Sequence, residues 1–464
     1  MKKILKIFLT LSLATVLGCS NTDEIYVDLQ VDEKEQYSGG DFTAFNTSEE
    51  AFGFAGTNLT NSEQIDFGVG NSFFRQSWVS APASTTARDG LGPFFNSVSC
   101  ANCHFKDGRG RPPAFDGEKS RGLLLRLTTE GNYPDGSDYV DPIYGGQLQD
   151  SAILGHSIKG SYTVSYQTII EKFDDGTTVE LQKPSYHIRD LGYGSLGTST
   201  KISPRIAPQM TGLGLLEAID ESTILAFAID NNKNEISGRP NYVYDILTKS
   251  TKIGRFGWKS NQPNVRQQVA AAFSGDMGIT SYLFPNENCP PGVNCDEIPN
   301  GGTPEITNIN LDRVAVYSST LAVPARRNHK DQNVLAGKKT FETLQCASCH
   351  IPKMKTGNTH PIMSLRNQTI RPYTDLLLHD MGPGLADNAK DFKASGNEWR
   401  TQPLWGIGLI QTVNKHTNLL HDGRARNIEE AILWHGGEAQ KSKDVYKKLS
   451  AQNRKDLLAF INSL

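Results

Sequence analysis

The chain has 464 residues, of which 21% are charged, and its formal net charge is −3. This length leaves room for two or three domains with ample hydrophobic core. The nearly balanced charge lacks the basic excess of nucleic-acid-binding domains, so we expect no nucleic-acid partner. The 43 glycines and 22 prolines predict many loops between short elements.

The amino terminus has the parts of a secretory signal. Lysines at positions 2, 3 and 6 precede an apolar run at residues 7–17 that is too short to span a bilayer. The run ends in Val16-Leu17-Gly18-Cys19, which resembles a bacterial lipobox; an ordinary exported protein with a stray cysteine is the alternative. We expect residues 1–18 to be a lipoprotein signal peptide, and lipid on Cys19 to hold the protein at the periplasmic side of a bacterial membrane, with the outer membrane favoured.

A cysteine-histidine pentapeptide occurs twice: Cys100-Ala101-Asn102-Cys103-His104 returns as Cys346-Ala347-Ser348-Cys349-His350. In such a CxxCH box the two thiols form thioethers with haem vinyl groups and the histidine ligates the iron. Chance would supply about 0.002 boxes in this composition. A zinc knuckle would need four ligands, and a redox CxxC has no use for the histidine. The boxes predict two covalently attached c-type haems, with His104 and His350 as proximal ligands.

Secondary structure around the first box is mixed. The segment at residues 19–48 is polar, acidic and aperiodic, which predicts a tether. Strands are predicted where Val, Thr, Tyr and Ile accumulate, at residues 123–128, 161–172 and 177–182. Asp174-Asp175-Gly176 joins the last two into a hairpin. Helical periodicity is found at residues 213–228 and 265–273.

The second box lies in a smaller module. A helical pattern at residues 333–344 leads into the box, and residues 450–464 predict a closing amphipathic helix. These are the two ends of a small cytochrome c domain, which we set at residues 326–464, after an N-terminal haem domain at residues 49–325. The predicted fold is therefore mainly α, with two cytochrome c-like haem domains, the first enlarged by a β-hairpin-containing insertion.

The remaining two cysteines flank a turn. Cys289 and Cys295 enclose Pro290-Pro291-Gly292, and an oxidising compartment would let them close a small disulfide loop.

The sixth ligand of the second iron is predicted from a helix that begins at Asn427. Ile428, Ala431, Ile432 and His435 share one face of this helix, so His435 lies among apolar side chains and needs a partner, which an iron would supply. The alternative is a histidine that interacts only with the helix carboxyl end. Met381 ranks second as a ligand, and His379 is a further rival.

The first iron has no equally clear sixth ligand, which suits a site open to peroxide. Glu217, in an apolar helix, and Gln209 just upstream are candidates for the distal acid or hydrogen-bond donor. Glu217 could instead form a structural ion pair with Arg205 or Arg239. His156 and Met277 are weaker ligand candidates.

Aromatic and basic residues near the boxes suggest supporting roles. Trp258 and Trp405 could shorten an electron path between the haems, although a buried tryptophan is usually core. Arginines suit carboxylates, so haem propionates could pair with Arg109, Arg111, Arg424 and Arg426.

Four segments match the motifs of a known family: LGPFFNSVSCANCHFKDGRGRPP, GRFGWKSNQPNVRQQVAAAFSGDMGITS, RPYTDLLLHDMGPGLAD and LLHDGRARNIEEAILWHGGEA. Through them the chain resembles the bacterial di-haem oxidoreductase family, also labelled thiol oxidoreductases. It is more distantly similar to di-haem cytochrome c peroxidases and to the related enzyme that matures a tryptophan-derived cofactor. In those peroxidases a methionine ligates the electron-donating haem where this chain has His435. Bis-histidine ligation implies a lower potential.

The resemblance implies a peroxidase-like oxidoreductase with one catalytic and one electron-transfer haem. Hydrogen peroxide or another small oxidant would be the substrate, a small cytochrome c or cupredoxin the electron donor, and calcium a possible further ion. The alternatives are oxidation of a protein or organic substrate through a high-valent haem pair, and a two-haem electron carrier.

Overall fold

The computed structural model describes residues 31–464, apart from residues 116–117, 119–121 and 232–235. The predicted signal peptide and Cys19 lie outside the described residues. Within that part of the chain, no helix combines the length and the apolar character needed to cross a bilayer.

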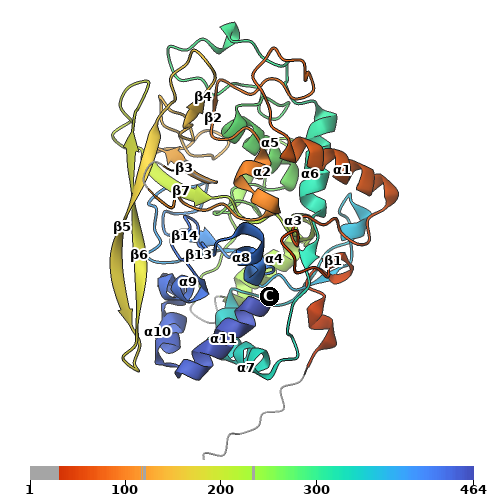
Figure 1. Ribbon diagram of the computed structural model, residues 1–464, viewed down its shortest axis with the longest axis vertical. Helices are drawn as coiled ribbons and strands as arrows, with labels where there is room; N and C mark the ends of the chain where they lie inside the picture. Colours follow the sequence, from red (N-terminus) through yellow and green to blue (C-terminus); the bar gives the residue numbers. More distant parts are fainter. Residues whose placement is uncertain (1–30, 116–117, 119–121, 232–235) are drawn as a thin grey trace, which may run out of the picture. The chain divides into compact units, whose positions relative to one another are not determined.

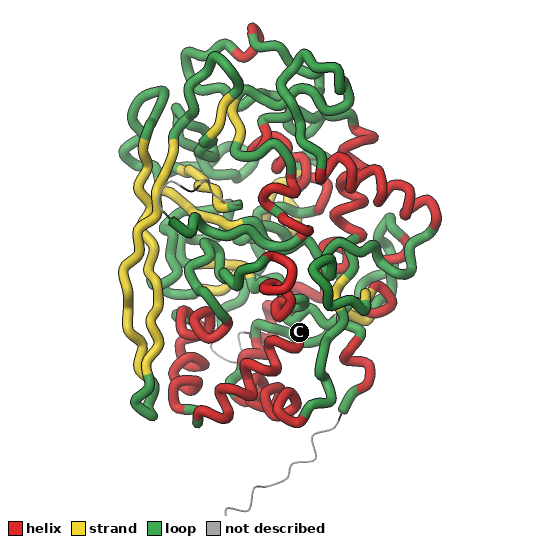
Figure 2. The backbone as a smooth tube through the Cα atoms, in the orientation of Figure 1, coloured by secondary structure: helices red, strands yellow, loops and turns green. Residues whose placement is uncertain are grey.

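Helices and strands are interspersed through the described part of the chain (Figures 1 and 2). The α-helices are α1 Asn61–Arg75, α2 Cys100–Cys103, α3 Leu213–Glu217, α4 Glu221–Asn231, α5 Val265–Met277, α6 Asn308–Thr320, α7 Gln332–Thr343, α8 Ile410–Asn414, α9 Ile428–Trp434, α10 Gln440–Lys448 and α11 Ala451–Ser463. The antiparallel strand pairs are β2 Phe94–Phe95 with β4 Ser151–Ala152, β3 Leu123–Thr128 with β7 Lys201–Ile206, β5 Ser161–Lys172 with β6 Thr178–Arg189, β8 Tyr242–Asp245 with β9 Ser250–Ile253, β11 Met354–Lys355 with β12 Thr369–Ile370, and β13 Leu378–Asp380 with β14 Glu398–Arg400. A parallel pair joins β1 Thr43–Ala44 to β10 Val323–Pro324.

The prediction of a mainly α fold is wrong. The structure has 31% helix and 19% strand, divided among several two-stranded sheets, and it does not show cytochrome c-like domains as such. Most of these strands have two to four residues, which is too short for an alternating pattern to be read from the sequence. Long loop segments still have to pair their buried backbone groups, and the short sheets do this.

Two pairs of helices cross closely, and a glycine permits each crossing. In the first pair, a Cβ on Gly70 of α1 would lie 2.1 Å from the carbonyl oxygen of Arg313 in α6. In the second pair, a Cβ on Gly337 of α7 would lie 1.9 Å from the carbonyl oxygen of Asp456 in α11. These contacts bring α1 and α7, the helices that precede the two boxes, firmly against a later helix.

The predicted hairpin is present and is longer than expected. β5 and β6 each have twelve residues, paired from Ser161 with Arg189 to Lys172 with Thr178. In Figure 1 the two yellow strands run along one side of the molecule, past α9 and α10. Lys443 and Lys447 of α10 both bind Glu171 of β5, which holds the hairpin against the C-terminal helices.

Residues 31–464 form one compact unit, so the boundary predicted between residues 325 and 326 stays a prediction. The described end of the predicted tether packs against this unit. Phe42 is fully buried, and Arg326 pairs with Glu35 inside the protein. The predicted disulfide between Cys289 and Cys295 is confirmed.

Candidate functional site

The first box opens onto a large cavity. α2 is a single helical turn that places Cys100, Cys103 and His104 on the cavity wall. The cavity has about 1820 Å³ of empty volume, open solvent included. Apolar side chains such as Phe74, Leu216 and Val265 line it together with a few polar groups, the composition that is usual for cofactor pockets.

The His104 ring is held in one tautomer by the backbone. Its Nδ1–H donates to the carbonyl oxygen of Pro208 at 2.8 Å, which leaves the Nε2 lone pair available to a metal. The Phe74 ring from α1 lies 6.1 Å from the imidazole. Burial lowers the pKa of His104 to about 4, so the ring is neutral at neutral pH, as a metal ligand must be.

The second box repeats this arrangement with different elements. Cys346, Cys349 and His350 line a second cavity of about 1520 Å³ of empty volume, open solvent included. The Nδ1–H of His350 donates to the carbonyl oxygen of Tyr373 at 2.9 Å, and the Phe341 ring from α7 lies 6.2 Å away. Burial lowers the pKa of His350 to about 4. The histidines of the two boxes therefore have the same tautomer and are both neutral.

The cysteines of both boxes are unpaired and in an environment that disfavours thiolate. Burial raises the pKa of Cys103 and of Cys346 to about 12, and it also raises the pKa of Cys100 and Cys349. Reactive and metal-binding thiols instead have lowered pKa values. The thiols therefore lack the lowered pKa of cysteines that carry out thiol redox chemistry.

The predicted apolar face of α9 lines the second cavity. Ile428, Ala431, Ile432 and His435 all line it, and Asn427 caps the helix by accepting the backbone N–H of Glu430 at 2.9 Å. The Nδ1–H of His435 donates to the carbonyl oxygen of Ala431 at 2.7 Å, which again leaves Nε2 uncommitted. Burial lowers the pKa of His435, so this ring is neutral too.

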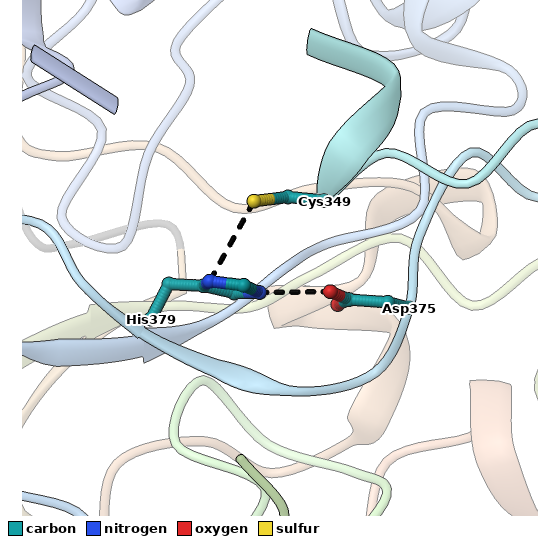
Figure 3. A group of neighbouring side chains, drawn as sticks. All are labelled: Cys349, Asp375 and His379. Carbon is teal, nitrogen blue, oxygen red and sulfur yellow. Dashed lines mark hydrogen bonds and ion pairs between the residues drawn. The ribbon is translucent and has the colours of Figure 1, made fainter. Parts of the chain in front are cut away.

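The rival ligands in this cavity differ in availability. Met381 lines the cavity. Both nitrogens of His379 are occupied, because Nε2 lies 2.8 Å from Asp375 and Nδ1 lies 2.8 Å from Glu438. Figure 3 shows the His379 ring between Asp375 and Cys349, whose sulfur is 3.5 Å from Nδ1.

The atoms of Cys349, Asp375 and His379 lie within 4.8 Å of one another, a spacing that could hold a metal ion. Burial lowers the pKa of His379, but Asp375 and its other partners raise it well above its ordinary value. We therefore interpret the group as a buried ion-paired imidazolium rather than an iron ligand.

The two cavities share a wall. The residues that line both are Arg109, Gln209, Trp258, Arg400, Gln402 and Pro403. They come from segments about 300 residues apart in the chain. Groups bound in the two cavities would therefore face each other across a single layer of side chains.

Trp258 is fixed in this wall by its backbone surroundings. Its Nε1–H donates to the carbonyl oxygen of Ile206 at 2.7 Å, and its own carbonyl accepts the N–H of Arg400 at 2.9 Å. The preceding Gly257 has φ +79°, and a Cβ there would lie 2.0 Å from the Asn261 side-chain oxygen. Trp405, the other predicted relay, is buried but lines neither cavity.

Two arginines in the wall lack a carboxylate partner among the described residues. Arg109 has an unpaired buried Nε, and Arg400 has an unpaired buried Nη1. Burial lowers the pKa of each to about 10. Haem propionates would supply the missing carboxylates. The sequence did not single out Arg400.

The other predicted propionate partners are already paired. Arg111 binds Glu118, Arg424 binds Asp422 and Arg426 binds Glu430. None of these arginines lines either cavity.

The two predicted distal residues, Gln209 and Glu217, lie in different places in the structure. Gln209 lines both cavities; its Nε2 donates to the Trp405 carbonyl at 2.5 Å, and its Oε1 is buried without a partner. Glu217 lines neither cavity, and its carboxylate lies 3.7 Å from His360 rather than near Arg205 or Arg239.

The carboxylates that line the first cavity are Asp150 and Asp276, which the sequence analysis did not identify. Burial raises the pKa of Asp276, and Gln147 donates to it at 2.8 Å. Met277 also lines this cavity, whereas His156 does not. The only earlier signal for Asp276 was its place in the GDMG motif.

Comparison of the chain with known protein families agrees with this site. A family model described as "Di-haem oxidoreductase, putative peroxidase" matches residues 32–131 and 146–464. No curated protein and no solved structure matches the chain with significance. The family description implies two haems, and the described residues include two cavities, each lined by one CxxCH box. Since the match covers nearly all of the sequence, the chain belongs to the di-haem oxidoreductase family.

Proposed function

We propose that the protein is a peroxidase-like di-haem c-type oxidoreductase, in which the haem at the Cys100 box is catalytic and the haem at the Cys346 box transfers electrons. The observation that carries the proposal is a difference between the two adjoining cavities in the histidines that line them. The second cavity has His435, a neutral histidine with an uncommitted Nε2, in addition to His350. Among the described residues, the first cavity is lined by His104 and no other histidine.

The residues fit covalent haem. Each box presents two thiols and one neutral histidine to its own cavity, and the shared wall holds two arginines without carboxylate partners among the described residues. When bound, the haems supply iron that can exchange electrons with a donor and with peroxide. His350 and His435 would both hold the iron of the second haem, which suits electron transfer, whereas His104 would hold the iron of the first haem without a second histidine, which suits reaction with a small oxidant.

We assign proton handling in the first cavity to Asp276 in place of Glu217. Reduction of peroxide needs a group that holds and delivers a proton beside the substrate. Asp276 lines the cavity and is held by Gln147, while Glu217 is outside it. Gln209 would act as a hydrogen-bonding neighbour from the shared wall.

A two-haem electron carrier is the second candidate, and one observation favours it. Met277 is buried and lines the first cavity, so it could hold the iron there together with His104. Electron paramagnetic resonance of the purified holoprotein separates the two functions. A high-spin signal in the oxidised or half-reduced state, cyanide binding, and turnover of peroxide with a reduced cytochrome support the peroxidase. Only low-spin signals, with no binding of cyanide or peroxide, would make the protein a carrier.

The electron donor that we propose is a small cytochrome c or cupredoxin, and the location is the periplasmic side of the membrane through lipid on Cys19. Replacing Cys19 with serine should release the protein from the membrane fraction of a host that processes lipoproteins. An unchanged distribution would show that something other than this lipid holds it.

A further inference from the structure

The ammonium of Lys259 lies in a closed cage of oxygen atoms beside the second cavity. Its Nζ donates to Oδ1 of Asp387 and to the carbonyl oxygens of Ala389 and Ser395, each at 2.8 Å. The side chains of Lys259 and Asp387 are 0% and 1% exposed. Three acceptors for three N–H donors require the charged form of the amine.

An aromatic ring completes the cage. Nζ lies 4.4 Å from the centre of the Trp399 ring, a distance at which the ring face attracts a cation. The oxygens all come from the segment that connects β13 to β14, which is closed by the N–H of Asp387 donating to the carbonyl of Gly396 at 3.1 Å. One loop thus surrounds a single positive charge that a distant part of the chain supplies.

We propose that the loop at residues 387–395 is a binding site for an alkylammonium ion, which the Lys259 side chain fills in the wild-type protein and which n-propylammonium can fill when that side chain is shortened. One carboxylate, two carbonyl oxygens and a ring face balance one positive charge. Calcium takes six to eight oxygen ligands and is a poorer match for this cage.

The filled cage positions residues at the shared wall. Lys259 directly follows Trp258, so its anchor fixes the backbone that carries this indole. On the other side, the Trp399 ring stacks on His421 with centroids 3.9 Å apart and an interplanar angle of 11°. Trp399 and His421 both line the second cavity. Lys259 is therefore a positioning residue for Trp258 in the shared wall and for Trp399 and His421 in the second cavity.

Chemical rescue of the full-length holoprotein tests the proposal. Lys259→Ala removes three methylenes and the ammonium, the atoms of n-propylammonium. Thermal unfolding of this variant is measured with n-propylammonium and with tetramethylammonium, at equal ionic strength. We expect the variant to melt several degrees below the wild type, and n-propylammonium alone to restore the lost temperature in a saturable way. The exposed Lys252→Ala is the matched control and should respond to neither ion.

An equal response of Lys259→Ala to both ions, or no response, would overturn the proposal. A second pair of variants covers the case in which Lys259→Ala does not fold. Lys259→Met keeps the volume but leaves the buried Asp387 carboxylate without its cation, although Ser203 and the Ala389 N–H still donate to it, so adding Asp387→Asn should raise the melting temperature. A double variant that is no more stable than Lys259→Met would exclude a charged cage. These readouts use stability alone, so they do not depend on the proposed peroxidase activity.

Discussion

The guanidinium of Arg109 lies 5.4 Å from the centre of the Trp258 ring, in the wall that both cavities share. A buried cation over an indole stabilises the ring in place. The same guanidinium keeps N–H groups for a carboxylate that the described residues do not provide. This pair therefore joins the two features that the proposed electron path needs, a fixed aromatic ring and a site for propionates.

Trp258→Phe should slow electron exchange between the haems severalfold, because the smaller ring leaves a gap in the shared wall. The measurement is reoxidation of the second haem after stopped-flow mixing of the half-reduced protein with peroxide. Trp405→Phe is the matched control, since Trp405 is buried outside both cavities. If both variants slow the exchange equally, the slower rate does not depend on the position of Trp258 in the shared wall.

Arg109→Gln and Arg400→Gln should each lower the reduction potential of a haem, because loss of a positive charge favours the oxidised iron. We expect shifts of tens of millivolts; about 59 mV corresponds to a tenfold change for one electron. Spectroelectrochemical titration measures both potentials. Arg426→Gln, which removes an arginine paired with Glu430 outside the cavities, should leave them unchanged.

His435→Ala should convert one low-spin haem to high spin, because it removes the proposed sixth ligand of the second iron. Electron paramagnetic resonance and the visible spectrum report this change. Met381→Leu is the comparison, since Met381 lines the same cavity. A spin change in Met381→Leu with none in His435→Ala would reverse the assignment.

Asp276→Asn should lower the turnover of peroxide by about 10²- to 10⁴-fold, the usual contribution of a general acid-base group. The amide keeps the size of the side chain, so haem content should stay the same. Glu217→Gln should leave turnover near the wild-type value, because Glu217 lines neither cavity. Loss of turnover in Glu217→Gln alone would return the role to that residue.

Glu287→Gln should stabilise the protein above neutral pH. Burial, with Glu305 nearby, raises the pKa of Glu287 to about 8, and its Oε2 is buried without a hydrogen-bond partner. The folded state keeps a proton between about pH 4.5 and 8 that the unfolded state releases, so wild-type stability falls as pH rises through this window.

In urea unfolding at pH 5 and pH 8, Glu287→Gln should show a flatter pH dependence and gain about 1–3 kcal/mol at pH 8. The exposed Glu130→Gln should keep the wild-type slope. A steeper slope in Glu287→Gln would contradict the assignment.

The local sequence pattern predicted several helices and strands correctly and missed others. The helices at α5, α7 and α11 and the hairpin β5–β6 were predicted, because each has enough residues to show its period. Residues 213–228 form two helices, α3 and α4, instead of the one expected. The short sheets were missed, because a strand of two residues has no period and forms only when a distant partner is in place.

The sequence by itself showed the two CxxCH boxes and the family, because such a box is defined by the spacing of neighbouring residues. It also predicted that His435 faces the same side as the apolar residues of α9, although this helix ends at Trp434 and His435 is its C-cap. Only the tertiary structure decided that Arg109 and Arg400 meet at one wall, that Trp258 and not Trp405 lies there, and that Asp276 and not Glu217 faces the first cavity. These outcomes depend on packing between segments hundreds of residues apart, and no local pattern encodes such packing.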